Sequence, residues 1–418
     1  MEASNMPLTI SCHCGAARQT LAPLANQDLF SGASFCHCDT CRHITGLLCT
    51  SYTPISPHPA PSIVGLESYS TSPISIRYFC SKCGCHVFRI TRRSPSALPE
   101  DWSWEVATGT IIDAPNSKIP EQWHHLHVND TRDGGLALWL PNPPPITTSP
   151  TPPSQPEHSS NNNNSSSSSS ILSASCQCKS ISLQITPPSS DLSVNPDSPY
   201  PDLLLPYIST PSDEVANPSR EKWYLRPSPS PSSVTTTHDS PESTTDPLSQ
   251  PDSNATSTRY LAGTCACPSC RLTSGFEIQT WAFIPRRNIL ISSFSSSSSS
   301  PESTEHHHHQ PLDFAHLPEE GVSLLRQYES SAGRMREFCA RCGATVFWHD
   351  RFRPDLIDVS AGLFWAGEGA RAESWLEWWR GRVSFSEEAG KGREGGAKVW
   401  GERIVVELEG RLSARQHQ

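Results

Sequence analysis

Cysteine is the residue type whose spacing points most directly to chemistry in this sequence. Residues 35–42 read FCHCDTCR and place the thiols of Cys36, Cys38 and Cys41 within six positions. A disulfide joins two sulfur atoms, so a bridge between any two of these thiols leaves the third unpaired. Zinc is bound by several cysteine sulfurs at once, at short spacings of this kind. The stretch therefore predicts a metal site rather than a disulfide.

The overall composition agrees with metal-bound, reduced cysteines. The chain has 418 residues, 16 cysteines, a formal net charge of −10 and a pI near 5.9. The N-terminus has no basic stretch followed by an apolar one, and no apolar run has the length of a bilayer span. Exposed thiols stay reduced in the cytosol. We therefore expect a cytoplasmic protein, with the nucleus as an alternative, that has no membrane partner and little affinity for nucleic acid.

The cysteine motifs occur twice in the same order. The first set reads SCHC at 11–14, then FCHCDTCRHITG, then RYFCSKCGCHVF. The second set reads SCQC at 175–178, then TCACPSCRLTSG, then REFCARCGATVF. Each set uses seven cysteines, and only Cys49 and Cys85 lie outside the pattern. An order of this length does not repeat by chance, so the sequence predicts an internal duplication.

Stretches poor in apolar residues divide the chain. Residues 141–171 are rich in proline, serine and asparagine and are expected to form a disordered linker. We therefore expect two domains with modest separate cores, over residues 8–140 and 172–410. Similar stretches at about 187–256 and 293–311 predict disordered insertions in the second domain. The first insertion would explain why 86 residues separate Cys178 from Cys265, against 21 between Cys14 and Cys36. The second would explain why 68 residues separate Cys270 from Cys339, against 38 between Cys41 and Cys80.

The segments that carry the cysteines are predicted to be strands. Alternate residues of a strand point to one face, so a C-x-C pair presents two sulfurs side by side, and C-x-x-C followed by glycine suits a tight turn around a metal. β-Branched and aromatic residues concentrate in ISIRYFC, CHVFRI, WSWEVATGTII and LALWL, and later in FEIQTWAFI, ATVFWH, LIDVSAG and RIVVELEG. The predicted fold class is mainly β, with two small zinc-bound β domains in tandem and little helix. Zinc would stabilise cores of this size.

Further motifs give the first copy a resemblance to a known family. Besides the cysteine frame it contains GTIID at 109–113, then His127, then DGGLALWL at 133–140. In this order the motifs resemble the family of glutathione-dependent formaldehyde-activating enzymes, which also includes centromere protein V. The resemblance spans nearly all of residues 8–140 and implies a fold of the β-tent type. The second copy shares the cysteine frame but has no plain counterpart of Asp113 or His127, so its activity is less certain than its metal sites.

The resemblance implies how the sulfurs are shared between zinc ions and what the protein does. In each copy four cysteines would close a structural site, and three would hold a second zinc with an open fourth position. The implied four-cysteine sets are Cys12, Cys14, Cys80 and Cys83, and Cys176, Cys178, Cys339 and Cys342. The implied catalytic sets are Cys36, Cys38 and Cys41 and, if the second copy is active, Cys265, Cys267 and Cys270. The implied activity is a carbon–sulfur lyase that reversibly forms or cleaves S-hydroxymethylglutathione or a related thiol adduct, with glutathione as the partner thiol. Three thiolates already outweigh the charge of Zn²⁺, which favours binding of a substrate thiolate over activation of water.

Two alternatives remain open at this point. In the first, the zinc bound by three cysteines has a fourth protein ligand, which would make that site structural. The candidates for this ligand are His37, His43, Cys49 and Cys85. The protein would then be a non-enzymatic zinc-binding scaffold or a chromatin-associated module. Alternatively only the first copy is active, and the second serves as its folding partner.

Several other polar or aromatic residues have two readings each. Arg42 and Arg271 follow the three-cysteine motifs and would either steer an anionic thiol or offset the charge of the sulfurs. His127 would act as an acid or base, or belong to a histidine-rich surface strand with His124 and His125. The remaining expectations are that Trp375, Trp378 and Trp379 pack a core or an inter-domain face, and that His306 to His309 are solvated.

Overall fold

The computed structural model describes residues 6–25, 28–98, 101–115, 117–145, 171–227, 258–293, 308–316 and 324–414. Most of the expected linker, residues 146–170, lies outside this part of the chain. Within it, no helix combines the length and the apolar character that crossing a membrane requires.

The first copy consists of two sheets, three-stranded in the order β2-β1-β9 and seven-stranded in the order β10-β3-β4-β8-β7-β6-β5. All neighbours pair antiparallel except β10, which runs parallel to β3. The strands are β1 (Leu8–Ile10), β2 (Gln19–Leu21), β3 (Ser34–Cys36), β4 (Thr50–Ile55), β5 (Leu66–Ser72), β6 (Ser75–Cys80), β7 (His86–Thr91), β8 (Ser103–Ala107), β9 (Ile111–Ala114) and β10 (His124–Leu126). The helices are α1 (Asp39–Thr45) and the 3₁₀ turns η1 (Leu29–Gly32), η3 (Thr108–Thr110), η4 (Val128–Thr131) and η5 (Gly135–Trp139).

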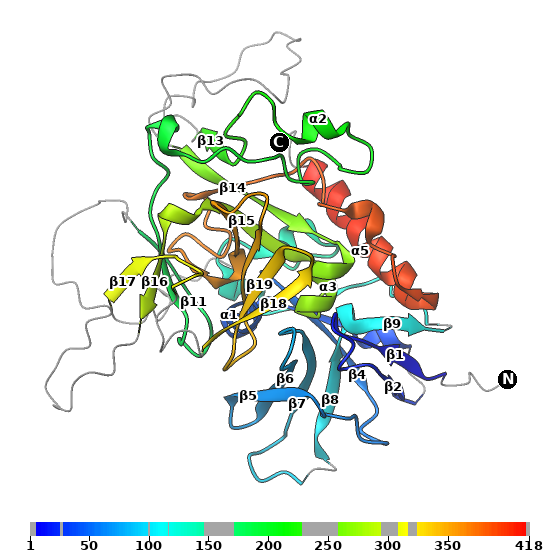
Figure 1. Ribbon diagram of the computed structural model, residues 1–418. Helices are drawn as coiled ribbons and strands as arrows, with labels where there is room; N and C mark the ends of the chain where they lie inside the picture. The colour runs from blue at the N-terminus through cyan, green and yellow to red at the C-terminus, as the bar shows by residue number, and fades with distance from the viewer. Residues whose placement is uncertain are drawn as a thin grey trace, which may run out of the picture.

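The second copy repeats this plan with additions (Figure 1). Its sheets have the orders β17-β16-β12-β11-β22 and β13-β14-β15-β21-β20-β19-β18, and β23 pairs parallel with β14 as β10 does with β3. The strands are β11 (Leu172–Ser175), β12 (Ser182–Ile185), β13 (Leu225–Pro227), β14 (Thr258–Cys265), β15 (Gln279–Pro285), β16 (Ile289–Ser293), β17 (His308–Pro311), β18 (Leu325–Ser331), β19 (Arg334–Cys339), β20 (Thr345–Asp350), β21 (Leu356–Ser360), β22 (Phe364–Trp365) and β23 (Leu376–Trp378). The helices are α2 (Ser212–Val215), α3 (Pro268–Ser274), α5 (Gly395–Ala414), and the 3₁₀ turns η6 (Leu192–Val194), η8 (Arg286–Asn288), η9 (Ala361–Leu363) and η10 (Ser386–Glu388). The prediction of a mainly β fold built twice is confirmed.

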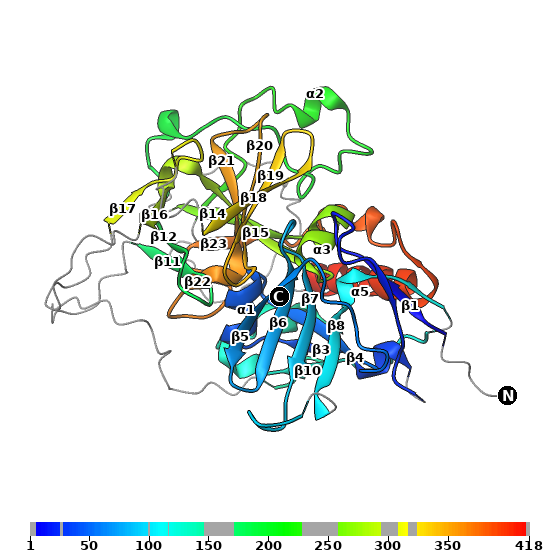
Figure 2. The same ribbon diagram turned by 60° about the horizontal axis from the view of Figure 1, so that its bottom comes forward.

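Matching backbone hydrogen bonds join the two copies. The C-x-C loop of each copy donates a backbone N–H to the short helix of the other copy that carries the third cysteine, which is α3 or α1. The turns η3 and η9 donate in the same way to the glycines that end α3 and α1. The four bonds are His13 N to Leu272 O, Gln177 N to His43 O, Gly109 N to Gly275 O and Gly362 N to Gly46 O, each 2.9 Å long. Because each of these four bonds has its reciprocal, the copies pack as a pseudo-symmetric pair, with α1 of the first copy beside η9 of the second and α3 beside η3 (Figure 2).

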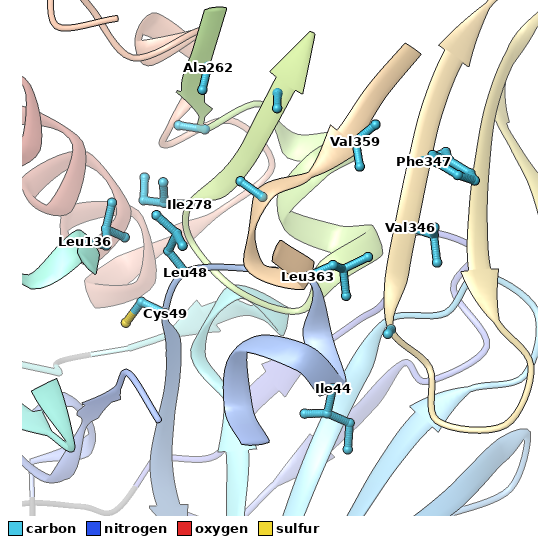
Figure 3. Close-up of a cluster of buried hydrophobic side chains, with 14 of the residues drawn as sticks. Ile44, Leu48, Cys49, Leu136, Ala262, Ile278, Val346, Phe347, Val359 and Leu363 are labelled. Carbon is cyan, nitrogen blue, oxygen red and sulfur yellow. The ribbon is translucent and has the colours of Figure 1, made fainter. Parts of the chain in front are cut away.

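A single apolar core runs through both copies, where separate cores were expected. Ile44 and Leu48 of the first copy lie close to Ile278 and Leu363 of the second in the interior of the molecule (Figure 3). All four side chains are at most 5% exposed. Burial of apolar surface is the main stabilising contribution to folding, so each copy relies on the other for part of its core.

Two segments predicted as strands are helical. Residues 403–410, RIVVELEG, lie inside α5, where Trp400, Ile404 and Leu408 form a buried face at helical spacing. That face packs on the first copy: the Trp400 ring stacks on Phe30 with the centroids 4.8 Å apart. Residues 136–140, LALWL, belong to η5 and its end, after Gly134 with a φ of 82°. Contacts across the copies therefore override the strand propensity of both segments.

The first insertion is folded over much of its length, contrary to expectation. Residues 187–227 contain η6, α2 and β13, and the side chains of Leu203, Trp223 and Tyr224 are at most 4% exposed. These apolar residues are spaced among prolines and serines, and they repay the ordering of a segment whose average composition is polar. Of the second insertion, β17 is paired with β16. Residues 228–257 and 294–307, which include His306 and His307, lie outside the described residues.

Candidate metal centres

Fourteen cysteines gather in four groups whose sulfur atoms lie within 4.8 Å of one another. Two groups have four members: Cys12, Cys14, Cys80 and Cys83, and Cys176, Cys178, Cys339 and Cys342. Two have three members: Cys36, Cys38 and Cys41, and Cys265, Cys267 and Cys270. The structure thus brings together the same sets, four and three in each copy, that the resemblance implies.

The sulfur geometry suits a tetrahedral metal. The sulfurs of Cys12 and Cys14, of Cys14 and Cys80, and of Cys36 and Cys38 are each 3.5 Å apart. With Zn–S bonds of about 2.3 Å, sulfurs at the corners of a tetrahedron are separated by about 3.8 Å. A disulfide would require about 2.05 Å, and the cysteines are free. The four groups are therefore capable of holding zinc-sized ions, and the residues fit that metal.

Each four-sulfur group joins distant parts of its copy. Cys12 and Cys14 follow β1, whereas Cys80 and Cys83 lie at the turn between β6 and β7. The backbone N–H of Ala17 donates to the Cys12 sulfur at 3.4 Å, an interaction that favours the thiolate. The second copy matches this bond with Ile181 N–H and Cys176 at 3.4 Å. Four sulfurs leave no position for another ligand, so these groups are suited to a structural role.

Each three-sulfur group lies where a strand runs into a short helix. In the first copy Cys36 ends β3, Cys38 caps the N-terminus of α1, and Cys41 lies in its first turn. The backbone N–H of Cys41 donates to the Cys38 sulfur at 3.3 Å, and Gly46 ends the helix with a left-handed φ of 81°. Cys36 and Cys41 are buried, whereas Cys38 is half-buried. The second copy repeats this arrangement on α3, with Cys267 as the half-buried cap.

An arginine from the neighbouring hairpin contacts each three-sulfur group. The Arg77 guanidinium donates from Nη2 to the Cys41 sulfur at 3.1 Å, and Arg336 reaches Cys270 at 3.4 Å. Hydrogen bonds from Cys36 and Cys38, followed by the positive charge of Arg77, hold the pKa of the Cys41 thiol well below its usual value against the opposing effect of burial. Sequence reasoning missed these arginines, although both stand three residues before a cysteine in the repeated RYFC and REFC motifs.

The two arginines named from the sequence have other contacts. Arg42 is 4% exposed and pairs with Asp39 one helical turn away. Arg271 is 1% exposed and donates to the backbone oxygens of Gly109, at 2.6 Å, and Lys391, at 3.2 Å. Arg271 therefore stabilises the interface between the copies and does not face an incoming thiol.

None of the four side chains considered as a fourth ligand joins the three sulfurs among the described residues. His37 Nε2 lies 3.0 Å from His125 Nδ1. The ring of His43 faces the second copy, with Nδ1 2.9 Å from the Ser175 carbonyl oxygen. The thiols of Cys49 and Cys85 each donate to a backbone oxygen at 3.5 Å. The first three-sulfur group thus has no further protein ligand in the part of the chain that is described.

The other residues singled out from the sequence are spread over the fold. His127 is exposed and follows β10, directly after the residue that faces Cys36. Asp113 lies in β9, paired with Thr9 and bridged to Glu394, and takes no part in the three-sulfur group. Trp378 lies in a strand and packs on Trp139 of the first copy, with ring centroids 5.4 Å apart, so the expected inter-domain packing is found at this residue. The flanking residues Trp375 and Trp379 are half-buried.

Comparison with known families agrees with this geometry. Residues 7–124 match the family described as glutathione-dependent formaldehyde-activating enzyme. Over these residues the first copy is similar to this family. The match covers β1 to β9 and all seven cysteines of the first frame, and it ends at the first residue of β10. No curated protein and no solved structure matches the chain. Beyond residue 124, the repeated sheets and sulfur groups relate the second copy to the first.

Proposed function

We propose that the first copy is a zinc-dependent carbon–sulfur lyase that reversibly forms or cleaves S-hydroxymethylglutathione or a closely related thiol adduct. The observation that carries the proposal is the group of Cys36, Cys38 and Cys41, which offers three sulfurs and no further protein ligand among the described residues. It lies in a region similar to a family named for glutathione and formaldehyde. The chain would hold four zinc ions, one for each sulfur group.

The residues of the first site suit a reaction in which sulfur leaves as thiolate. Zinc bound there would supply a cation that holds a substrate sulfur in its anionic form at neutral pH. Arg77 holds the Cys41 sulfur and adds positive charge on the buried side of the group. Arg89 adds a second guanidinium, which lies over the ring of Tyr52 at 4.7 Å and is paired with Glu105. This charge would offset the three cysteine thiolates and reduce their repulsion of an incoming sulfur.

The proposed cleavage is balanced without an oxidant or reductant. The S-hydroxymethyl hydroxyl gives its proton to water, its oxygen forms the second bond of the carbonyl, and the electron pair of the C–S bond leaves with the sulfur. Formaldehyde and a thiolate are the products, and the reverse reaction adds the thiolate to the carbonyl. His127 is exposed and directly follows Leu126, which pairs with Cys36, so it would be placed to exchange a proton with water near the site.

Zinc content and turnover test the proposal in the same preparation. Mass spectrometry of the native full-length chain is expected to find four zinc ions, of which a chelator removes those in the three-sulfur groups first and glutathione protects the first site. Cys38→Ser is expected to abolish turnover of S-hydroxymethylglutathione, and Cys267→Ser is the matched variant at the equivalent position of the other copy. Full zinc occupancy with no turnover would refute the enzyme and leave the zinc-binding scaffold as the function.

A further inference from the structure

The three-sulfur group of the second copy lies under aromatic side chains. Trp281 is buried against Cys265 and Cys270, and Trp348 and Phe385 pack against the same cluster. Indole and phenyl rings present apolar faces with a weak negative potential. The surroundings of these sulfurs therefore favour apolar and aromatic groups over charged ones.

Equivalent positions in the first copy carry polar side chains. Trp281 on β15 takes the place of Tyr52 on β4, since both stand eleven residues after the third cysteine of the motif and pair with equivalent strands. Trp348 takes the place of Arg89. In the first copy Arg77, which contacts Cys41, is paired across the sheet with Arg89 on β7. In the second copy Arg336, which contacts Cys270, is paired with Trp348 on β20. A guanidinium beside the first group is thus exchanged for an indole beside the second.

Phe385 takes the place of His127. In the first copy the backbone N–H of His37, which follows Cys36, donates to Leu126 O at 3.0 Å. In the second copy the backbone N–H of Ala266, which follows Cys265, donates to Ser384 O at 2.9 Å. The next residue of that segment has a left-handed φ, 57° for His127 and 55° for Phe385. His127 is exposed, whereas Phe385 is half-buried against the cysteines. The second copy thus has a counterpart of His127 in position, but not in chemistry.

The folded part of the first insertion holds Phe385 in place. The Asp202 carboxylate accepts the backbone N–H of Phe385 at 2.6 Å and a hydrogen bond from Arg382 at 3.1 Å. Tyr207 donates its backbone N–H to the same carboxylate at 2.8 Å and sets its ring edge-on to Phe385, with centroids 6.2 Å apart. The first copy has only 21 residues between the corresponding cysteine motifs and no such segment.

Apart from Arg336, the positive charges around the second group are paired with carboxylates. Arg336 contacts Cys270, but the next guanidinium, that of Arg353, lies over the Trp348 ring at 4.7 Å and is paired with the buried carboxylate of Asp358. The cations around this side of the cluster, Arg353, Arg382 and Lys391, are each paired with a carboxylate of the described chain, so an incoming carboxylate would have to compete for them. Burial of such a charge without a partner is strongly unfavourable.

We infer that the second three-sulfur group is a site for a thiol, or its aldehyde adduct, whose carbon side is aromatic and uncharged, with Trp348 and Phe385 selecting it against glutathione. Asp202 is the positioning residue that sets Phe385 over the sulfurs. The inference rests on the proposed function for the idea that a thiol enters a three-sulfur zinc site, and it assigns to the second copy a substrate class that differs from that of the first.

Thiol binding to the cobalt-substituted full chain tests the inference without turnover. In Cys38→Ser, with the first site disabled, benzyl mercaptan and glutathione are titrated while the thiolate-to-Co²⁺ absorption is followed. Benzyl mercaptan is expected to bind at least about tenfold more tightly, the ratio that one or two aromatic contacts supply. In Cys267→Ser, where only the first site reports, glutathione is expected to bind at least as tightly as benzyl mercaptan.

The exchange Trp348→Arg with Phe385→His gives the second site the residues of the first, and its preference is expected to fall by about tenfold or to reverse. Asp202→Ala is expected to reduce the preference while the metal content stays unchanged. If either cysteine variant fails to fold, the parental chain is titrated with benzyl mercaptan in saturating glutathione, which occupies the first site.

The titration either supports or overturns the aromatic thiol site proposed for the second copy. Absence of thiol binding at the second site, equal affinity for the two thiols, or a preference that survives the double exchange would overturn it. These results would leave the proposed function untouched, since that depends on glutathione and turnover at the first site. Failure of glutathione at the first site, with benzyl mercaptan still binding at the second, would refute the proposed function alone.

Discussion

Gly46 and Gly15 offer a matched test of how much the two copies depend on each other. Both have a φ of +81°, so alanine meets the same backbone strain at either position. A Cβ at Gly15 would meet nothing within 4 Å. A Cβ at Gly46 would lie 2.2 Å from the backbone oxygen of Thr345 in the second copy. The difference between the two variants therefore isolates the contact between the copies.

The magnitudes can be worked from these contacts. A non-glycine residue in the left-handed region costs about 1–2 kcal/mol, which is the whole effect expected for Gly15→Ala. Gly46→Ala adds overpacking of about 1–3 kcal/mol, because a backbone carbonyl must move. It also strains the 2.9 Å bond from Gly362 N to Gly46 O, worth about 1 kcal/mol. Gly46→Ala is thus expected to lower the free energy of unfolding by about 2–4 kcal/mol more than Gly15→Ala.

Urea unfolding followed by tryptophan fluorescence measures this difference, since Trp139 and Trp378 meet across the interface. Gly275→Ala serves as the reciprocal variant, because its Cβ would lie 2.0 Å from the backbone oxygen of His86 in the first copy. Equal losses for Gly15→Ala and Gly46→Ala would show that the copies are not packed as described.

Three further predictions follow from buried charges. Arg393 and Glu277 form a buried ion pair at 2.8 Å, so Arg393→Met is expected to destabilise the protein by about 3–5 kcal/mol in urea unfolding, and adding Glu277→Leu should recover much of the loss. Burial raises the pKa of Asp358 to about 6 despite its pairing with Arg353. The folded state therefore binds more protons than the unfolded state between about pH 4 and 6, so the free energy of unfolding falls as the pH rises through that window. When the free energy of unfolding of Asp358→Asn is measured against pH, this fall should be absent. Arg77→Met removes the cation that contacts Cys41 and is expected to increase zinc loss from the first three-sulfur group in a chelator competition, whereas Arg326→Met, at an exposed ion pair with Glu67, should not.

Local spacing was enough to predict the repeated frame and the kind of site. A C-x-C pair and a C-x-x-C pair bring sulfurs together through a few backbone angles, so the motifs at 11–14 and 35–42 pointed to metal before any fold was known. The same local argument predicted strands such as β6, β7 and β15 correctly. It failed for residues 403–410, whose burial on the first copy makes them helical.

What only the tertiary structure decided are the contacts between segments far apart in the chain. Arg77 reaches Cys41 through the register of β6, and Phe385 stands at the position of His127 although one has a phenyl ring and the other an imidazole. Neither relation follows from spacing, because sheet register and packing between the copies set it. The sequence by itself determined fourteen sulfurs in two equivalent frames. The fold decided that each three-sulfur group contacts one arginine, and that the first has Arg89 where the second has Trp348, because side chains from distant strands surround each site.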